Sequence, residues 1–207
     1  MSLQRITCSE ASPLIHECDP CNRELGRVRS VLLIRSKQYL DELVELIKKD
    51  VDAHTAETEK DVVNKFEKLI ESGDLHLISE TTGTFDGGSA QTGDGYGDED
   101  SRLLGYQKTL TYKDPSYANN GDFYEAIEKE KWYLAWRTET LLHFADKPAS
   151  FQAIDPVEED LTSAVVWNVT ATWKTKKKET LLPADTLAKY FDGCWADGGV
   201  SSTSLDD

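Results

Sequence analysis

The segment that decides the fold spans residues 103–144 and reads LLGYQKTLTYKDPSYANNGDFYEAIEKEKWYLAWRTETLLHF. Apolar and polar side chains alternate between Leu104 and Tyr112, a period that places one face of a β-strand on a core and the other toward solvent. Pro115 ends the pattern, because proline fixes φ and lacks the N–H that a strand donates. The sequence therefore predicts a half-buried strand that stops before Pro115.

The rest of this segment predicts a short helix followed by an extended chain. Residues 119–122 (Asn-Asn-Gly-Asp) supply a turn and a helix N-cap. Phe123 and Ile127 then form an apolar i,i+4 pair on a helix expected at 122–131. Side chains alternate again along 131–144, where we expect one extended segment. One face of it carries Trp132, Leu134 and Trp136.

The composition fits a single domain, residues 1–207, with a sizeable core. Of the 207 residues 39% are hydrophobic, and 38 acidic residues against 23 lysines and arginines give a net charge of −15. Sequence-specific binding of nucleic acid is not expected of such an acidic chain, because that binding relies on lysines and arginines that replace the counterions of the phosphates. No apolar run approaches the roughly 20 residues of a membrane span. Residues 1–18 lack the apolar core of a signal peptide, so we expect intracellular synthesis and no membrane partner.

The first third of the chain predicts an arm, a strand and a helical hairpin. Residues 1–26 are irregular and hold three of the four cysteines, which predicts an N-terminal arm. The apolar run within 27–36 is typical of a strand buried on both faces. Apolar residues at helical spacing form one stripe over 37–51 and another over 57–72. The short link between them predicts an antiparallel αα-hairpin over 37–72.

Strands dominate the remainder of the chain. Alternation predicts them at 74–84, at 149–154 and, most regularly, at 163–174. Residues 85–101 are rich in glycine and aspartate, and glycine costs too much entropy to order alone. We therefore expect a flexible acidic loop at 85–101. The basic residues 174–178 predict either a hairpin tip or a linker.

Together these elements predict an α+β fold. Its main part is an antiparallel β-sandwich, with the αα-hairpin inserted near the N-terminus and one short flanking helix. A further short helix is expected at 184–191, stopped by Gly193. Residues 196–207 form a polar C-terminal tail with little to bury.

The cysteines raise the question of a metal clip. Cys18 and Cys21 have the Cys-x₂-Cys spacing that grips zinc when two further ligands join. The available ligands are Cys8, Cys194 and His16. No second Cys-x₂-Cys or His-x₃-His pair is present, and Pro20 with no helix after it does not fit a thioredoxin-type redox pair. We expect either reduced cysteines that hold the arm on the core or a clip between the arm and the C-terminus, and no metal or cofactor.

The acidic loop resembles no established ion site. Its carboxylates belong to Asp86, Asp94, Asp98, Glu99 and Asp100. Ca²⁺ favours carboxylates between sharp glycine turns, but the spacing of an EF-hand is absent. The glycines do not form a phosphate cradle, because no Gly-Lys-Ser/Thr follows them and the five acids would repel phosphate. We therefore expect solvated side chains here.

No set of residues points to catalysis. The histidines are His16, His54, His76 and His143, and none has a spacing to a nucleophile or a carboxylate that indicates a triad. Four tryptophans at period-two spacing can form a ligand platform but are more typical of a sandwich core. They are Trp132, Trp136, Trp167 and Trp173. We expect a protein that is not an enzyme; an enzyme with a site built from dispersed residues is one alternative.

The order of these features resembles a family of virus proteins. It runs from the cysteine-containing arm to GRVRSVLLI at 26–34, LTYKDP at 110–115, a short helix before Trp132, RTET at 137–140 and a long strand at 165–173. This order resembles the virion structural proteins of phages that infect Bacteroidetes, including crAss-like phages. The similar proteins are ring and tail-tube-like subunits, and the resemblance covers about residues 18–174.

The resemblance implies a tail-tube-like β-sandwich without catalytic activity. Made in the host cytoplasm, such a subunit forms a hexameric or dodecameric ring in the tail or neck of the virion, around the DNA channel. Its implied partners are further copies and neighbouring tail or neck proteins, with DNA passing through unbound. An acidic channel wall is compatible with this, because it repels DNA. We expect residues 85–101 and both terminal arms to contact neighbouring subunits. The alternative is a soluble acidic binding module with a metal clip at Cys18 and Cys21.

Overall fold

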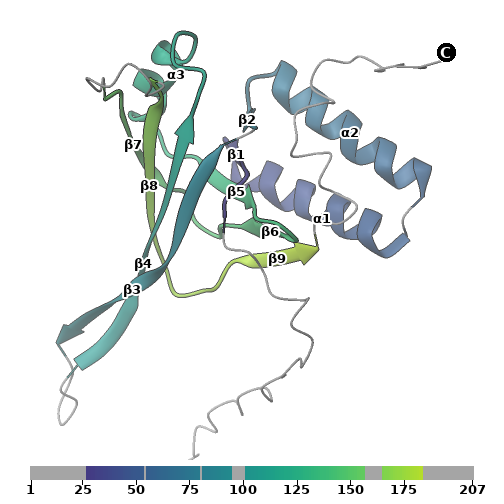
Figure 1. The fold of residues 1–207 in the computed structure, drawn as a ribbon. Helices are drawn as coiled ribbons and strands as arrows, with labels where there is room; N and C mark the ends of the chain where they lie inside the picture. The colour runs from purple at the N-terminus through teal and green to yellow at the C-terminus, as the bar shows by residue number, and fades with distance from the viewer. Residues whose placement is uncertain (1–26, 54, 80, 95–100, 157–164, 184–207) are drawn as a thin grey trace, which may run out of the picture.

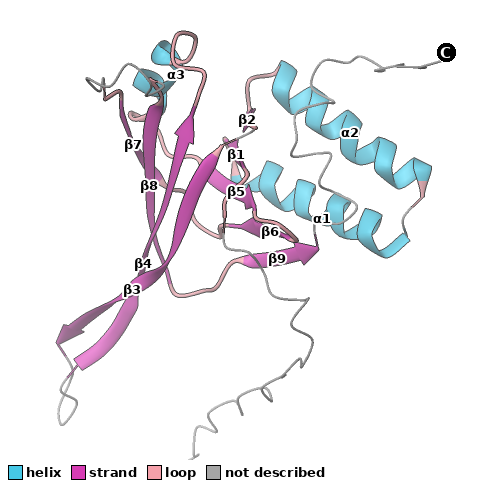
Figure 2. Ribbon diagram, in the orientation of Figure 1, coloured by secondary structure: helices cyan, strands magenta, loops and turns pink. Residues whose placement is uncertain are grey.

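The computed structural model describes residues 27–53, 55–79, 81–94, 101–156 and 165–183. Within these residues the chain forms nine strands and three helices, drawn in Figures 1 and 2. The strands make two antiparallel sheets, so the prediction of an α+β fold is confirmed. The expected arm, the helix at 184–191 and the C-terminal tail lie outside the described residues.

The two sheets differ in strand number and in position. The central sheet has five strands in the order β2 (Leu75–Ile78), β1 (Ser30–Ile34), β5 (Tyr133–Arg137), β6 (Leu141–Phe144) and β9 (Thr180–Pro183). The outer sheet has four strands in the order β3 (Thr82–Asp94), β4 (Ser101–Asp114), β8 (Trp167–Thr175) and β7 (Ser150–Ile154). A short helix, α3 (Gly121–Ile127), connects β4 to β5 and ends earlier than the 122–131 expected.

The central sheet lies between the outer sheet and a helical layer (Figure 1). Along β1, Val31 and Leu33 pack in the core shared with the outer sheet, whereas Leu32 and Ile34 pack against the helices. Successive side chains of a strand point to opposite faces. A strand between two cores therefore needs a continuous apolar run, which confirms the interpretation of this stretch as a strand buried on both faces.

The helical layer is the predicted αα-hairpin. Helices α1 (Lys37–Ala53) and α2 (Ala56–Glu71) lie side by side over one face of the central sheet (Figure 2). The stripe that each helix buries is Leu40, Leu43 and Ile47 on α1, and Val62, Phe66 and Leu69 on α2. Thr55 caps α2 in a reciprocal capping box with Thr58.

Aromatic side chains fill the core between the two sheets. The Trp136 ring lies 5.8 Å from Trp173 and 4.7 Å from Phe85, measured between ring centroids. Trp132, Trp136 and Trp173 are buried, which favours the core interpretation over a ligand platform. Trp167 is half-buried, and its Nε1 donates to the Tyr117 carbonyl at 3.1 Å.

The prediction of a loop at 85–101 is wrong for most of that range. β3 continues to Asp94 and β4 begins at Ser101, so only residues 95–100 lie outside the described chain. Glycine does cost entropy when it is ordered, but β4 pairs with β3 from Thr82 to Asp94, with two register shifts along the way. That pairing across the sheet overrides the local composition.

The single extended segment expected at 131–144 is also wrong. Residues 138–140 form a tight connection, and β5 and β6 pair with each other as antiparallel neighbours. The backbone N–H of Thr138 donates to the Leu141 carbonyl at 3.0 Å and closes the turn. Between the alternatives for 174–178, the linker is correct, because β8 belongs to the outer sheet and β9 to the central sheet.

Candidate assembly surface

β3 and β4 continue beyond the outer sheet as a two-stranded ribbon. β8 pairs with β4 from Asp114 to Tyr106 and no further, whereas β3 and β4 stay paired as far as Asp94 and Ser101. We call residues 91–94 and 101–105 the ribbon; it projects from the body of the molecule at the lower left of Figure 1. An isolated two-stranded hairpin is marginally stable in water. The ribbon is therefore the part of the described sheets that most needs a covering surface.

Register shifts in both strands bend the ribbon and its base. An extra residue of β3 shifts the register between Asp86 and Ser89, and an extra residue of β4, Leu104, shifts it between Gln91 and Thr92. At the first shift Gly88 has φ of 105°, and its N–H donates to Asp86 Oδ1 at 3.1 Å. β-Bulges bend a strand and increase its twist. Gly88 therefore allows β3 to bend at the first register shift.

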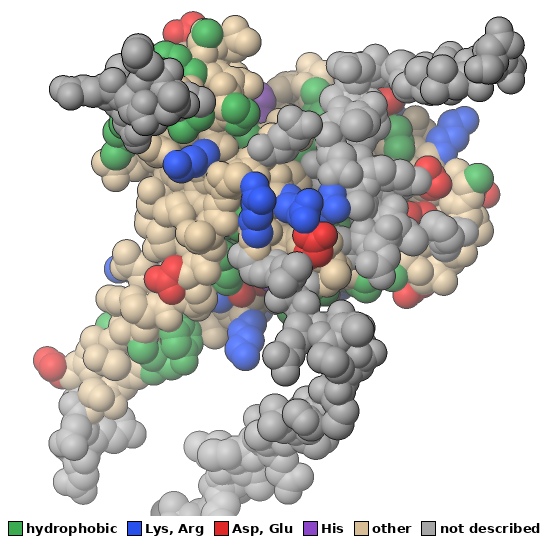
Figure 3. Space-filling view, in the orientation of Figure 1, with side chains coloured by type: hydrophobic (Ala, Val, Ile, Leu, Met, Phe, Trp, Pro, Cys, Tyr) green, Lys and Arg blue, Asp and Glu red, His purple; other side chains and the backbone are tan. Residues whose placement is uncertain are grey.

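The ribbon and its base expose apolar side chains. Leu103 and Leu104 remain 46% and 48% exposed, and Tyr106 remains 36% exposed. Leu103 pairs with Thr92, whereas Leu104 is the extra residue at the second register shift, and its side chain lies against Gly93. Hydrophobic side chains gather over this part of the molecule in Figure 3. Clustered apolar side chains of this kind mark a contact surface.

A cavity of about 480 Å³ opens where the ribbon meets the body. Leu104 and Tyr106 form part of its wall, together with lysines from the end of β8 and from the loops before β7 and after β8. The exposed lysines of this region are Lys147, Lys174, Lys176, Lys177 and Lys178, and we call this group the lysine end. Apolar walls beside a cationic rim suit an acidic protein surface.

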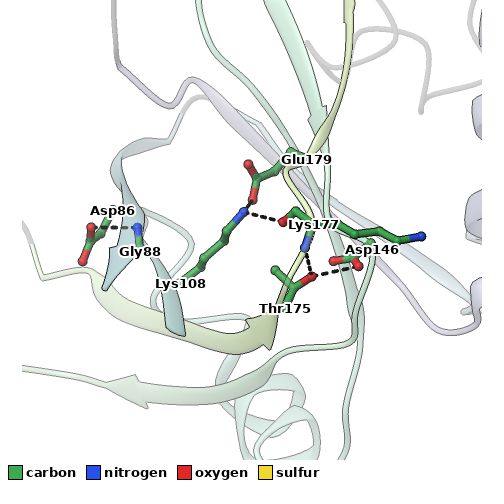
Figure 4. A network of polar contacts seen from close by, with 7 residues as sticks. All are labelled: Asp86, Gly88, Lys108, Asp146, Thr175, Lys177 and Glu179. Carbon is green, nitrogen blue, oxygen red and sulfur yellow. Dashed lines mark hydrogen bonds and ion pairs between the residues drawn. The ribbon is translucent and has the colours of Figure 1, made fainter. Parts of the chain in front are cut away.

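A buried ion pair holds the lysine end in place (Figure 4). Lys108 on β4 is only 3% exposed; it pairs with Glu179 and donates to the Lys177 carbonyl at 2.9 Å. Thr175 donates to Asp146 Oδ2 at 2.8 Å and accepts from the Lys177 N–H at 3.0 Å. These contacts fix the linker between β8 and β9 against the base of the ribbon. Lys108 therefore has a structural partner and is not a free catalytic amine.

A second buried polar group lies at the opposite end of β4. Asp114 is 2% exposed and accepts from Tyr124 at 2.7 Å, from Asn120 at 2.6 Å and from the Ser116 N–H at 2.8 Å. Burial raises the pKa of Tyr112 and the pKa of Tyr124 far above the usual value. Both phenols therefore stay protonated, and the Tyr124 hydroxyl can donate to Asp114.

The face of the outer sheet that points away from the core is polar and mostly uncharged. Thr84, Thr111, Thr170 and Gln152 follow one another across the four strands. The hydroxyls of Thr84 and Thr111 lie 2.8 Å apart. Leu110 and Tyr112, which alternate with Thr111, are buried on the other side. This face presents hydroxyl groups and neither a basic platform nor an apolar one.

Most of the candidate residues from the sequence lie outside the part of the chain that the structure describes, and those inside it are not grouped into a site. Cys8, Cys18, Cys21, Cys194, His16 and His54 lie outside the described residues, as do Asp98, Glu99 and Asp100. Asp86 and Asp94 lie on β3. His143 stacks on Trp136 with centroids 5.1 Å apart. The pKa of half-buried His76 is lowered, mainly by desolvation. Among the residues that the structure describes, no three His, Cys, Asp or Glu side chains are grouped to hold a metal ion.

The sequence does not reveal the exposed leucines of the ribbon, because their exposure depends on where a neighbouring strand ends. Leucine is a typical core residue, and Leu103 and Leu104 stay uncovered because β8 stops pairing with β4 at Tyr106.

None of the described helices is long and apolar enough to cross a membrane. In comparisons with known proteins, no family model, no curated protein and no solved structure matches this chain.

Proposed function

We propose that this protein is a non-catalytic structural subunit that assembles with further copies of itself into a ring of a phage tail or neck. The ring would surround the DNA channel and contact neighbouring tail or neck proteins. The phage context rests on the sequence resemblance over about residues 18–174. Self-assembly, the more general part of the proposal, rests on the shape and chemistry of the described surface.

The single observation that carries the proposal is the apolar ribbon. It extends past β8 with no third strand among the described residues, and it exposes Leu103 and Leu104. A two-stranded ribbon in water gains little from its own pairing, whereas burial of its leucines on a neighbour adds hydrophobic stabilisation. An arm of this kind is expected in a subunit whose fold is completed by assembly. It is not needed by a monomeric binding module.

The hydroxyl-rich face of the outer sheet supports the position at a channel. Binding of DNA depends on lysines and arginines that replace counterions, and Thr84, Thr111 and Thr170 offer none. A net charge of −15 further opposes DNA adsorption. Such a wall would let DNA pass without holding it. We also propose that the two sheets form a tail-tube-like β-sandwich.

The native mass of the purified full chain tests this proposal. Light scattering coupled to gel filtration, over a wide range of concentrations, is expected to give a closed multiple of 23.2 kDa. A hexamer or a dodecamer would fit the ring. A chain that stays at 23.2 kDa at every concentration contradicts self-assembly. Negative-stain images of the assembled fraction then distinguish closed rings from open fibres.

A further inference from the structure

The lysine end is cationic although the protein as a whole is strongly acidic. Its five lysines are exposed, and no ion pair within the described residues joins any of them to a carboxylate. The two acids nearby are half-buried and already occupied. Asp146 accepts from Thr175, and Glu179 pairs with Lys108. Beside these lysines lie the exposed side chains of Leu104 and Tyr106.

The opposite end of the outer sheet carries the opposite charge. Its exposed acids lie on and just after α3 and at the end of β7; they are Asp122, Glu125, Glu128 and Asp155, and we call this group the acidic end. Lys129 pairs with Glu125 at 2.8 Å, and the other three carboxylates join no ion pair within the described residues. Glu130 instead lies 3.8 Å from Arg35, and Lys131 lines a cavity with lysines of the lysine end. Even with the nearby exposed cations Arg27 and Lys113 counted, the acids of this end outnumber the cations.

The acidic end also exposes apolar side chains. Ile154 at the end of β7 is 52% exposed, and Val165 before β8 is 36% exposed. Each end thus combines charge with uncovered aliphatic groups. Interfaces between proteins combine these two features, since apolar contacts supply affinity and complementary charges supply orientation.

The two ends are separated by the length of the outer sheet. β4 pairs with Thr175 at Tyr106 and with Trp167 at Asp114, an interval of eight residues, or about 27 Å at the rise of a strand. Figure 1 places α3 at the top of the molecule and the ribbon at the bottom. One copy cannot join its own two ends across that distance. A second copy can bring its acidic end to the first copy's lysine end.

We infer that copies of this chain contact one another head to tail, with the lysine end of one copy on the acidic end of the next. The inference rests on the proposed self-assembly and names the surfaces that meet. Such a contact is heterologous, because it joins different patches of the two copies. It repeats from copy to copy, and it closes into a ring when the rotation per copy allows. The apolar groups of both ends are then covered together.

Charge reversal at one end at a time tests this contact. The Lys174→Glu/Lys176→Glu/Lys177→Glu variant leaves two lysines against three new glutamates at the lysine end, so both ends are acidic. The Asp122→Lys/Asp155→Lys variant leaves Glu125 and Glu128 against two new lysines and Lys129, so both ends are basic. Each variant alone is expected to require about tenfold or more protein for half-assembly, because attraction becomes repulsion. A 1:1 mixture of the two variants is expected to assemble, and so is one chain that carries all five changes. A control on the helical layer, Lys48→Glu/Lys49→Glu/Lys60→Glu, gives the same change of net charge as the lysine-end variant, away from both ends.

The readout is native mass by light scattering, with thermal unfolding as a check that each variant is folded. Salt is a second readout, because the Debye length falls from about 10 Å at 0.1 M to about 3 Å at 1 M. Loss of assembly in each single-end variant and recovery in the mixture support the contact. Wild-type assembly by both single-end variants overturns it and leaves the proposed self-assembly intact. Failure of the mixture and of the five-change chain, although both are folded, overturns it as well. A monomeric wild type contradicts the proposed function itself.

Discussion

Substitution of the two ribbon leucines should weaken assembly without unfolding the subunit. We consider Leu103→Asn together with Leu104→Asn, which keep roughly the same size and remove apolar surface. Full burial of a leucine side chain contributes about 1.5–3 kcal/mol. Because 46% and 48% of these residues remain exposed in the subunit, about half of that value, roughly 0.7–1.4 kcal/mol each, is left for an interface.

The two leucines together should therefore contribute about 1.4–2.8 kcal/mol to each interface. This corresponds to a dissociation constant about 10- to 100-fold higher in the double variant, since each 1.4 kcal/mol is a factor of ten. The free energy of unfolding of the subunit should change by less than about 0.5 kcal/mol per site, as is usual for exposed positions. Sedimentation velocity over a dilution series measures the first quantity, and urea unfolding measures the second.

Leu181→Asn is the matched control. Leu181 lies on β9 and is 51% exposed, so it loses as much exposed apolar surface as either ribbon leucine but lies elsewhere on the molecule. The reasoning would be refuted by a double ribbon variant that assembles at the same concentration as wild type. A Leu181→Asn variant that weakens assembly equally would refute it too, because the effect would then not belong to the ribbon.

Three further predictions concern the body of the subunit and the metal alternative. Lys108→Met leaves Glu179 buried without its partner and should cost about 3–5 kcal/mol in urea unfolding, most of which Lys108→Met/Glu179→Leu should recover; a single variant as stable as wild type would contradict this. Burial raises the pKa of Tyr112 above its usual 10.0, so the stability that its protonated phenol contributes is fully present below pH 10 and is lost as the pH rises above 10. Above pH 10, Tyr112→Phe should reduce the slope of the free energy of unfolding against pH by up to about 1.4 kcal/mol per pH unit. Equal slopes for the variant and the wild type would argue against this. Zinc bound to the full chain should stay well below one per chain, and a chelator should leave the melting temperature unchanged, whereas one zinc per chain would favour a clip at Cys18 and Cys21.

The helical layer and the central strand could be predicted because one local rule decides each of them. Apolar positions such as Leu40, Leu43 and Ile47 recur at the spacing of a helix face, and all three are buried as that spacing requires. The continuous apolar run of β1 likewise indicates a strand covered on both faces. In both cases the local pattern and the tertiary environment agree.

The ribbon could not be predicted, because its formation depends on a partner strand. Residues 85–94 have the composition of a loop, and only pairing with β4 turns them into a strand. The turn after β5 was missed for a related reason, since Thr138-Glu139-Thr140 has β-forming threonines and neither glycine nor proline. The ends of opposite charge were missed because their members, such as Asp122 and Asp155, come from separate segments.

Amide hydrogen exchange of the ribbon tests the central claim most directly. The amides of residues 91–94 and 101–105 should exchange quickly when the chain is diluted to monomer, because a two-stranded ribbon opens easily. At concentrations where the chain assembles, the same amides should become protected, while those of β1 in the core stay protected throughout. Ribbon amides that exchange equally fast in the assembled and the monomeric protein would contradict the claim that neighbouring copies cover the ribbon.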